Sequence, residues 1–287
     1  MLTSLNESRP VRTQFLIFTL FGDYVIYRGG QIWTTSLLKL MASLGVSERA
    51  VRSALSRMTR KSWITSEMYG RHSQYRLTPR GKALLEAGRE RIYEAAFSDW
   101  DNCWHLLVYS LPEKARRKRH ALRTQLTWLG FGHLAPGTWI SPRGRHAELE
   151  ALFSDLRVEP YVDLFSGLYR GPSSARELVE RCWDLSTLEE QYRDFIERFQ
   201  PEYEEYTRQS NGLVLSPELC FVRRFWLTHE FQSFPLKDPN LPPVLLPSDW
   251  PGFAARHLFN AYHQLLGTYA NQFVDEVMAD EDLPSGG

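Results

Sequence analysis

The sequence predicts an α+β multidomain protein, and three patterns support this fold class. Two short helical segments, joined by a turn that contains glycine, are followed by a β-hairpin within residues 34–77. Strands and helices then alternate in the order β-α-β-β-α-β over residues 104–169. From residue 173 onward, apolar residues recur at helical spacing. We therefore expect three domains, over residues 1–95, 96–172 and 173–287.

The first domain is expected to contain a helix-turn-helix. Gly22 and an Arg-Gly-Gly turn interrupt the first apolar segment. Thr34 or Thr35 is expected to cap the next helix, which Gly45 ends. Ser47 is then the expected N-cap of a second helix. Two short helices joined by a tight turn with glycine are typical of a helix-turn-helix.

The second of these helices has two contrasting faces. Val51, Leu55 and Met58 recur at the spacing of a buried stripe. Arginine can bond guanine edges or phosphates, and serine can bond either. Glu48 is the only acidic residue, and it lies at the first turn, where the helix dipole favours it. The other face predicts a DNA-reading surface made of Arg49, Arg52, Ser53, Ser56, Arg57 and Arg60.

A β-hairpin is predicted after this helix. One strand starts at Trp63, residues 68–72 form the turn, and residues 74–77 form the second strand. Thr78 and Pro79 are expected to start a further helix. The ordered set predicts an N-terminal winged helix-turn-helix domain, in which further DNA contacts are expected from Lys61, Arg71, His72 and Tyr75.

Charge is divided between the two halves of the chain, although the net charge is zero. Residues 1–145 carry 23 Lys plus Arg against 10 Asp plus Glu, and residues 146–287 carry 11 against 24. This division favours a polyanionic partner for the first half only, with chance segregation of solvated charges as the alternative. The expected partner is double-stranded operator DNA.

The middle segment predicts a ferredoxin-like βαββαβ domain. Its first strand is expected over residues 104–111, its helices over 113–129 and 147–156, and its last strand over 161–169, with residues 130–132 as a turn. We expect this domain to serve structure or dimerisation.

The last segment predicts an all-α domain. Pro201 is expected to end a first group of helices. A helix follows over residues 217–234, then a proline-rich loop over 235–252, and a final helix over 253–277.

Composition and motifs predict a cytoplasmic protein that is not an enzyme. The apolar run at residues 15–21 is too short to span a bilayer, and the N-terminus lacks the order of a secretory signal. Three widely spaced cysteines support neither disulfides nor a zinc ribbon. Phosphate-loop, dinucleotide and nucleophile-elbow motifs are absent. Position 233 is Ser, which breaks an HExxH pattern. We therefore expect no catalytic residue and no metal.

Five stretches of the sequence resemble the PaaX-type repressors, the regulators of phenylacetic acid degradation. The resemblance implies the three domains above and a homodimer that represses an aromatic-acid catabolic operon. It also implies that the last domain senses an effector, phenylacetyl-coenzyme A or a related acyl-coenzyme A, which releases the protein from its operator, with no other cofactor. The matching stretches are residues 22–41, 47–64, 70–81, 125–142 and 238–252.

The middle segment is also similar in topology to CRISPR-associated endonucleases of ferredoxin fold. Those enzymes carry an Asp at the end of their first strand, whereas this chain has Tyr109 and Ser110 there. Nuclease activity is therefore not expected.

Two further sets of residues have alternative interpretations. Residues 114–119 hold five cations that could meet DNA or coenzyme A phosphates, or could be a solvated helix start. A second set could line the effector pocket, or could pin a buried loop through Arg–Asp pairs. It consists of Arg223, Arg224, Asp238, Asp249, Trp250 and Arg256.

Two other functions are alternatives to the repressor. One is an enzyme acting on nucleic acids or thioesters that uses the winged helix only for docking. The other is a winged helix used for protein contacts, which the Arg and Ser face disfavours.

Overall fold

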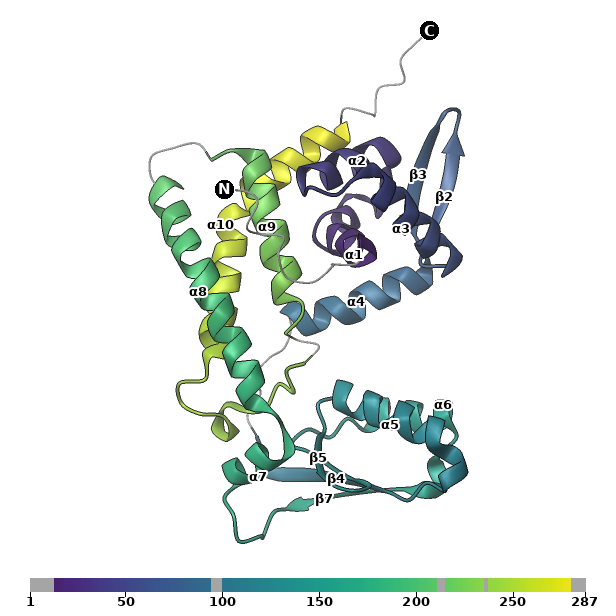
Figure 1. Ribbon diagram of the computed structural model, residues 1–287, viewed down its shortest axis with the longest axis vertical. Helices are drawn as coiled ribbons and strands as arrows, with labels where there is room; N and C mark the ends of the chain where they lie inside the picture. The colour runs from purple at the N-terminus through teal and green to yellow at the C-terminus, as the bar shows by residue number, and fades with distance from the viewer. Residues whose placement is uncertain (1–12, 94–99, 211–214, 235–236, 280–287) are drawn as a thin grey trace. The chain divides into compact units, whose positions relative to one another are not determined.

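The computed structural model describes residues 13–93, 100–210, 215–234 and 237–279. The chain forms two compact units: unit 1 is Met1–Glu94, Arg198–Gln232 and His257–Gly287, and unit 2 is Ala95–Glu197 and Ser233–Arg256. Most of the described residues are helical, and the strands form two small sheets (Figure 1). The predicted mixture of helices and strands is therefore confirmed. The C-terminal segment contributes to both units, and the predicted boundaries at residues 95 and 172 stay a prediction.

Unit 1 begins with helices around a three-stranded antiparallel sheet of order β1-β3-β2. Helix α1 buries Leu16, Ile17 and Leu20 in the core of this unit. The elements are α1 (Thr13–Asp23), the 3-10 turn η2 (Val25–Arg28), β1 (Gln31–Trp33), α2 (Thr34–Ser43), α3 (Glu48–Arg60), β2 (Ile64–Tyr69), β3 (His72–Leu77) and α4 (Pro79–Tyr93).

The start of α3 follows the sequence prediction, whereas the start of α2 does not. The Ser47 hydroxyl accepts a hydrogen bond from the backbone N–H of Ala50, so the predicted cap is confirmed. Helix α2 begins at Thr34 itself, and no side chain caps it. The Thr34 hydroxyl instead donates to the Ser73 carbonyl at 2.8 Å, because strand β3 lies beside this residue. The prediction that Thr34 or Thr35 caps the helix was therefore wrong.

Two other details of unit 1 differ from the prediction. Gly22 lies inside α1, whose buried neighbours Leu20 and Phe21 hold the helix to its end at Asp23. Strand β1 was not predicted, because three residues are too few to show an alternating pattern.

Helices from the end of the chain complete unit 1. They are the later part of α8 (Leu185–Ser210), α9 (Pro217–Phe231) and the later part of α10 (Pro251–Ala279). The Ser36 hydroxyl donates to the Val277 carbonyl at 3.1 Å and joins α2 to α10. Thr228 of α9 donates to the Asp23 carboxylate at 2.7 Å. The N-terminal helices and the last helices therefore share one core (Figure 1).

Pro201 does not end a helix, contrary to prediction, and lies inside α8. Proline removes one backbone hydrogen bond from a helix. The buried side chains of Phe195, Phe199 and Tyr206 hold the helix on both sides of this position. Burial of that apolar face offsets the lost hydrogen bond.

Unit 2 contains a four-stranded antiparallel sheet of order β5-β6-β4-β7. Leu107 and Trp139 of the sheet pack with Leu122 and Leu126, and helices α5 and α6 cover this face (Figure 1). The elements are β4 (Cys103–Tyr109), the 3-10 turn η3 (Glu113–Ala115), α5 (Arg116–Trp128), β5 (Gly132–Ala135), β6 (Thr138–Ser141), α6 (His146–Leu156), the 3-10 turn η4 (Glu159–Tyr161), β7 (Val162–Leu168), α7 (Ala175–Cys182) and the 3-10 turn η5 (Pro243–Leu245).

The predicted turn at residues 130–132 includes the first residue of strand β5, Gly132. A side chain at this glycine would meet the Trp183 ring at 2.6 Å, so the residue type follows from close packing and not only from a turn. Within the described ranges, no helix combines the length and the apolar character that crossing a bilayer requires.

Candidate nucleic-acid interface

Helix α3 is held against unit 1 by the stripe that the sequence predicts. Val51, Ala54, Leu55 and Met58 are each at most 1% exposed. Because these side chains occupy one face of the helix, the opposite face is fixed toward solvent. The predicted orientation of α3 is therefore confirmed.

All six predicted DNA-reading residues of α3 are exposed, namely Arg49, Arg52, Ser53, Ser56, Arg57 and Arg60. Two of the arginines are paired along the helix: Arg52 contacts Glu48 at 2.6 Å, and Arg57 donates to the Ser53 hydroxyl at 2.8 Å. Arg49 and Arg60 form no ion pair or hydrogen bond with any described residue. Their guanidinium groups are available to a ligand.

The further predicted DNA contacts, at the end of α3 and in the hairpin, lie in three different environments. The Lys61 ammonium lies 4.3 Å from the centre of the Trp63 ring, so part of its charge is already engaged. Arg71 and His72 are exposed at the tip, after Gly70, whose φ of 61° suits glycine in this turn. Tyr75 is half-buried in the central strand β3.

Sequence reasoning missed the group that supports the hairpin tip. The ring of Trp33 meets Tyr69 at 5.6 Å and His72 at 6.4 Å, both edge to face. Thr34 anchors the same hairpin at Ser73. Trp33 lies far from the hairpin in the sequence, so only the pairing of β1 with β3 reveals the contact.

The basic run at residues 114–119 belongs to unit 2 and is partly used within the fold. The Lys118 ammonium donates to the Arg157 carbonyl at 3.0 Å. Arg119 donates to the Leu111 and Pro112 carbonyls and pairs with Glu113 at 3.2 Å. Two of the five cations therefore tie the start of α5 to neighbouring segments.

Two of the predicted effector residues, Arg223 and Arg224, belong to unit 1 and contact acidic and aromatic groups there. Arg223 pairs with Glu202 at 3.0 Å. Arg224 is 9% exposed, and its guanidinium lies 5.0 Å from the centre of the Tyr24 ring. Burial raises the pKa of Asp23, but the His263 hydrogen bond and charge and the Arg224 charge outweigh it, so this pKa is lowered.

The other four predicted effector residues belong to unit 2. The Asp238 carboxylate accepts hydrogen bonds from the Tyr192 hydroxyl and the Asn240 N–H, each at 2.7 Å. Burial nevertheless raises the pKa of Asp238. Trp250 is buried and meets the Tyr192 ring edge to face. The remaining two are Asp249, which is exposed, and Arg256, which is half-buried. These contacts pin the proline-rich loop, and an effector role for the six residues stays a prediction.

Each unit also contains a cavity. The cavity in unit 1 has a volume of about 390 Å³ and is lined by Asp23, Tyr27, Arg28, Arg224, Asn271 and Asp275. Its Arg28 already pairs with Asp275 at 2.6 Å. Among the predicted effector residues, only Arg224 lines it.

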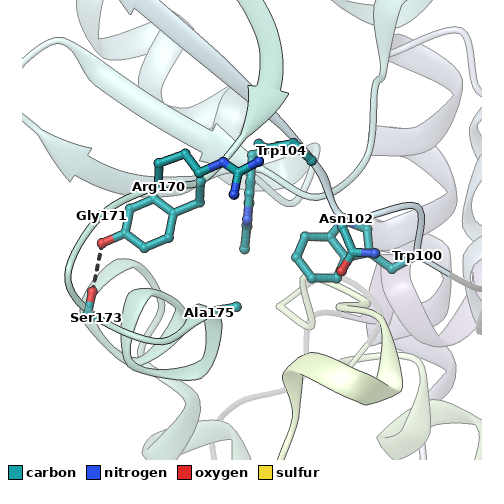
Figure 2. Close-up of a pocket in the computed structure, with 9 residues that line it drawn as sticks. Trp100, Asn102, Trp104, Arg170, Gly171, Ser173 and Ala175 are labelled. Atoms are coloured by element: carbon teal, nitrogen blue, oxygen red, sulfur yellow. Dashed lines mark hydrogen bonds between the residues drawn. The ribbon is translucent and has the colours of Figure 1, made fainter.

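The cavity in unit 2 was not predicted (Figure 2). Its volume is about 300 Å³, and it is lined by Trp100, Asn102, Trp104, Leu168, Tyr169, Arg170, Gly171, Ser173 and Ala175. These residues come from the start of β4, from the end of β7 that pairs with it, and from the segment that leads into α7. No local motif joins them.

The histidines and cysteines of the described residues lie in different environments. No group of three or more His, Cys, Asp or Glu side chains is placed there to hold a metal ion. Burial lowers the pKa of His229 to about 4. Cys182 and Cys220 are buried free thiols, and Cys103 is a half-buried one.

Comparison with known proteins agrees with the sequence-based resemblance. Residues 12–81 match the model of the "PaaX-like protein" family, residues 98–179 match the "PaaX protein central Cas2-like domain", and residues 183–276 match the "PaaX-like protein C-terminal domain". The chain is 35% identical over 270 residues to "Transcriptional repressor PaaX" of Escherichia coli (strain K12), which covers 93% of this chain and 84% of the relative.

A solved structure is similar over most of the chain. It is "Uncharacterized protein Rv0674 from Mycobacterium tuberculosis", with a TM-score of 0.56 and 27% sequence identity. The similarity covers 84% of this chain and 89% of that one. The matched domain models and the E. coli relative show that this chain belongs to the PaaX family.

Proposed function

We propose that this protein is a transcriptional repressor that binds operator DNA through the outward face of α3. The observation that carries the proposal is the orientation of this helix: an apolar stripe is buried, and an Arg and Ser face is exposed. Two of its arginines, Arg49 and Arg60, lack a partner among the described residues. An exposed helix with this chemistry suits the major groove. The E. coli relative is itself described as a transcriptional repressor.

The proposal includes a specific fold for each sheet-containing region. Helices α2 and α3 with the β2–β3 hairpin form a winged helix-turn-helix, supported by the order α2, α3, β2, β3 and the pairing of β1 with β3. Strands β4 to β7 form a ferredoxin-like domain, supported by the antiparallel order β5-β6-β4-β7 with helices α5 and α6 between strands. This order is the one expected of a βαββαβ unit.

The repressor is further proposed to act as a homodimer on a phenylacetate-type catabolic operon, and to leave its operator when an aryl-acyl-coenzyme A binds. These parts rest on the resemblance to PaaX-type repressors. The protein is a regulator and not an enzyme, in agreement with the description of its relative. The chain has Tyr109 and Ser110 at the end of the first strand of the sheet in unit 2, where the CRISPR-associated endonucleases carry an Asp, and this difference is consistent with a regulator.

The test is a mobility-shift titration of the wild-type protein on the promoter region of its own gene. Scrambled DNA of the same length is the control. Tight binding to the promoter only, released by phenylacetyl-coenzyme A and not by coenzyme A, is the expected result. Equal binding to both DNAs contradicts the repressor proposal. If the protein binds the promoter specifically but no acyl-coenzyme A releases it, only the effector assignment is contradicted.

A further inference from the structure

We infer that the cavity of unit 2 binds the aromatic ring of a small anionic ligand whose chemistry is that of a single-ring aryl acid. This inference deepens the proposed function, on which it rests, by giving the aromatic effector a binding place. None of the six predicted effector residues lines this cavity.

Three aromatic side chains form the walls. Trp100 and Trp104 meet edge to face with ring centres 5.0 Å apart, and Tyr169 also lines the cavity. Trp104 is 4% exposed and fixed from behind by Trp183, whose ring centre lies at 6.4 Å. Aromatic rings attract one another through edge-to-face and offset-stacked contacts. A flat ring is therefore the ligand group that these walls suit.

The walls are held in place by hydrogen bonds that leave the cavity open. The indole N–H of Trp100 donates to the Cys103 carbonyl at 3.0 Å. The Tyr169 and Ser173 hydroxyls are hydrogen bonded at 2.7 Å (Figure 2). Because both bonds are made within the protein, these aromatic side chains are preorganised and need little ordering when a ligand binds.

Two polar side chains at the cavity have no partner within the described ranges. Neither Arg170 nor Asn102 forms a hydrogen bond or an ion pair with any residue that the structure describes. In Figure 2, Arg170 lies on one side of the cavity and Asn102 on the other, with Trp104 between them. A guanidinium supplies paired donors that match a carboxylate or phosphate. The ring and an anionic group of one ligand can thus be bound together.

The size of the cavity limits its ligand. A volume of about 300 Å³ is at the lower end for small-molecule sites. It accommodates one aromatic ring with a short acyl chain, and it cannot enclose a whole coenzyme A thioester. The shared chemistry is therefore an aryl group with a nearby anion, supplied by a free aryl acid or by the aryl end of its thioester.

The unit 1 cavity is a weaker candidate for the same ligand. Its lining holds two carboxylates and two guanidinium groups, so its charges are balanced within the protein. Its aromatic lining is Tyr27 alone, which is 63% exposed. The geometry therefore favours the cavity of unit 2.

The experiment is isothermal titration of the full-length protein with phenylacetate, phenylacetyl-coenzyme A and acetyl-coenzyme A. Two variants change the cavity: Arg170→Gln removes the cation, and Ala175→Leu fills the space. Arg181→Gln is the matched control, because this exposed arginine of α7 lies outside the lining. Operator binding by each ligand-free variant is measured separately.

At least one of the two phenylacetyl compounds is expected to bind the wild type and Arg181→Gln equally. Arg170→Gln should weaken this binding about tenfold, the loss expected for one charge-assisted hydrogen bond. Ala175→Leu should abolish it, and acetyl-coenzyme A should not bind. The compound that binds identifies the source of the aryl group.

Three results would overturn the inference. They are no binding of either phenylacetyl compound, a ligand affinity of both cavity variants equal to that of the wild type, or binding of acetyl-coenzyme A as tight as that of the phenylacetyl compounds. Operator binding separates this inference from the proposed function. If ligand-free wild-type protein binds its operator while the cavity variants keep full ligand affinity, only the cavity assignment fails. If the wild type does not bind its operator, the repressor proposal fails, whatever the ligand results.

Discussion

Helix α3 in unit 1 and the basic run at residues 114–119 in unit 2 have similar positive charge but different local contacts. On α3, the arginine partners are side chains of the same helix, and Arg49 and Arg60 have none among the described residues. In the basic run, Lys118 and Arg119 hold backbone carbonyls of other segments. Charge density alone therefore does not identify a DNA-binding surface. An Arg and Ser face, on a helix whose opposite face is buried, is the better indicator.

The largest effect is expected when both unpartnered arginines of α3 are removed. The double variant Arg49→Ala, Arg60→Ala should bind the operator about 100-fold more weakly, since each contact to a base is worth about 1–3 kcal/mol. Fluorescence anisotropy with labelled operator at one salt concentration measures this loss. Far-UV circular dichroism should stay unchanged, because both side chains are exposed. Unaltered affinity would remove α3 from the interface.

The opposite effect, on stability and not on DNA binding, is expected in the basic run. Arg119→Ala should lower the free energy of unfolding by about 1 kcal/mol, because it removes hydrogen bonds to the Leu111 and Pro112 carbonyls. Urea unfolding followed by tryptophan fluorescence measures the change. Arg123→Ala, on the same helix, is the control. A stable Arg119→Ala protein that binds DNA poorly would reverse the comparison.

A smaller effect is expected from the exposed cations of the basic run. Lys114→Gln, Arg116→Gln and Arg117→Gln together should change operator affinity less than threefold and leave its salt dependence unaltered, if the run does not touch phosphates. The slope of log affinity against log salt distinguishes the alternatives. A slope reduced by about 2 or more would place the run at the DNA backbone.

A modest gain in operator affinity is expected when the acidic residue beside Arg52 is neutralised. Glu48→Gln removes a surface ion pair that contributes little to stability, since both side chains are more than half exposed. It also frees Arg52 and removes a negative charge from the DNA-facing helix. Operator affinity should rise a few-fold, and the melting temperature should hardly change. Weaker operator binding would mean that Glu48 positions Arg52 for its contact.

Local patterns in the sequence predicted much of the fold near α3. Ser47, the Val51–Leu55–Met58 stripe and the hairpin each depend on neighbours within a few residues. Helix α8 shows the opposite case, because burial of Phe199 and Tyr206 in tertiary contacts overrides the local effect of Pro201.

In the candidate sites, too, features set by neighbouring residues were predicted, and features set by tertiary contacts were not. The exposed arginines of α3 were predicted, since one helix determines their orientation. The Trp33 contact to the hairpin and the Trp100–Trp104–Tyr169 cavity were missed, because each depends on pairing between distant strands. A tryptophan in a sequence indicates burial or binding but does not show which other segments it will meet.

The most direct test of operator reading by α3 is cleavage of DNA from a defined point on this helix. Ser56→Cys in a Cys103→Ser background gives one exposed thiol, because Cys182 and Cys220 are buried. Iron-EDTA attached to this thiol should cut the promoter DNA inside the footprint of the protein, at positions flanking one major groove. Cuts outside the footprint, or none in a complex that still forms, would contradict the account.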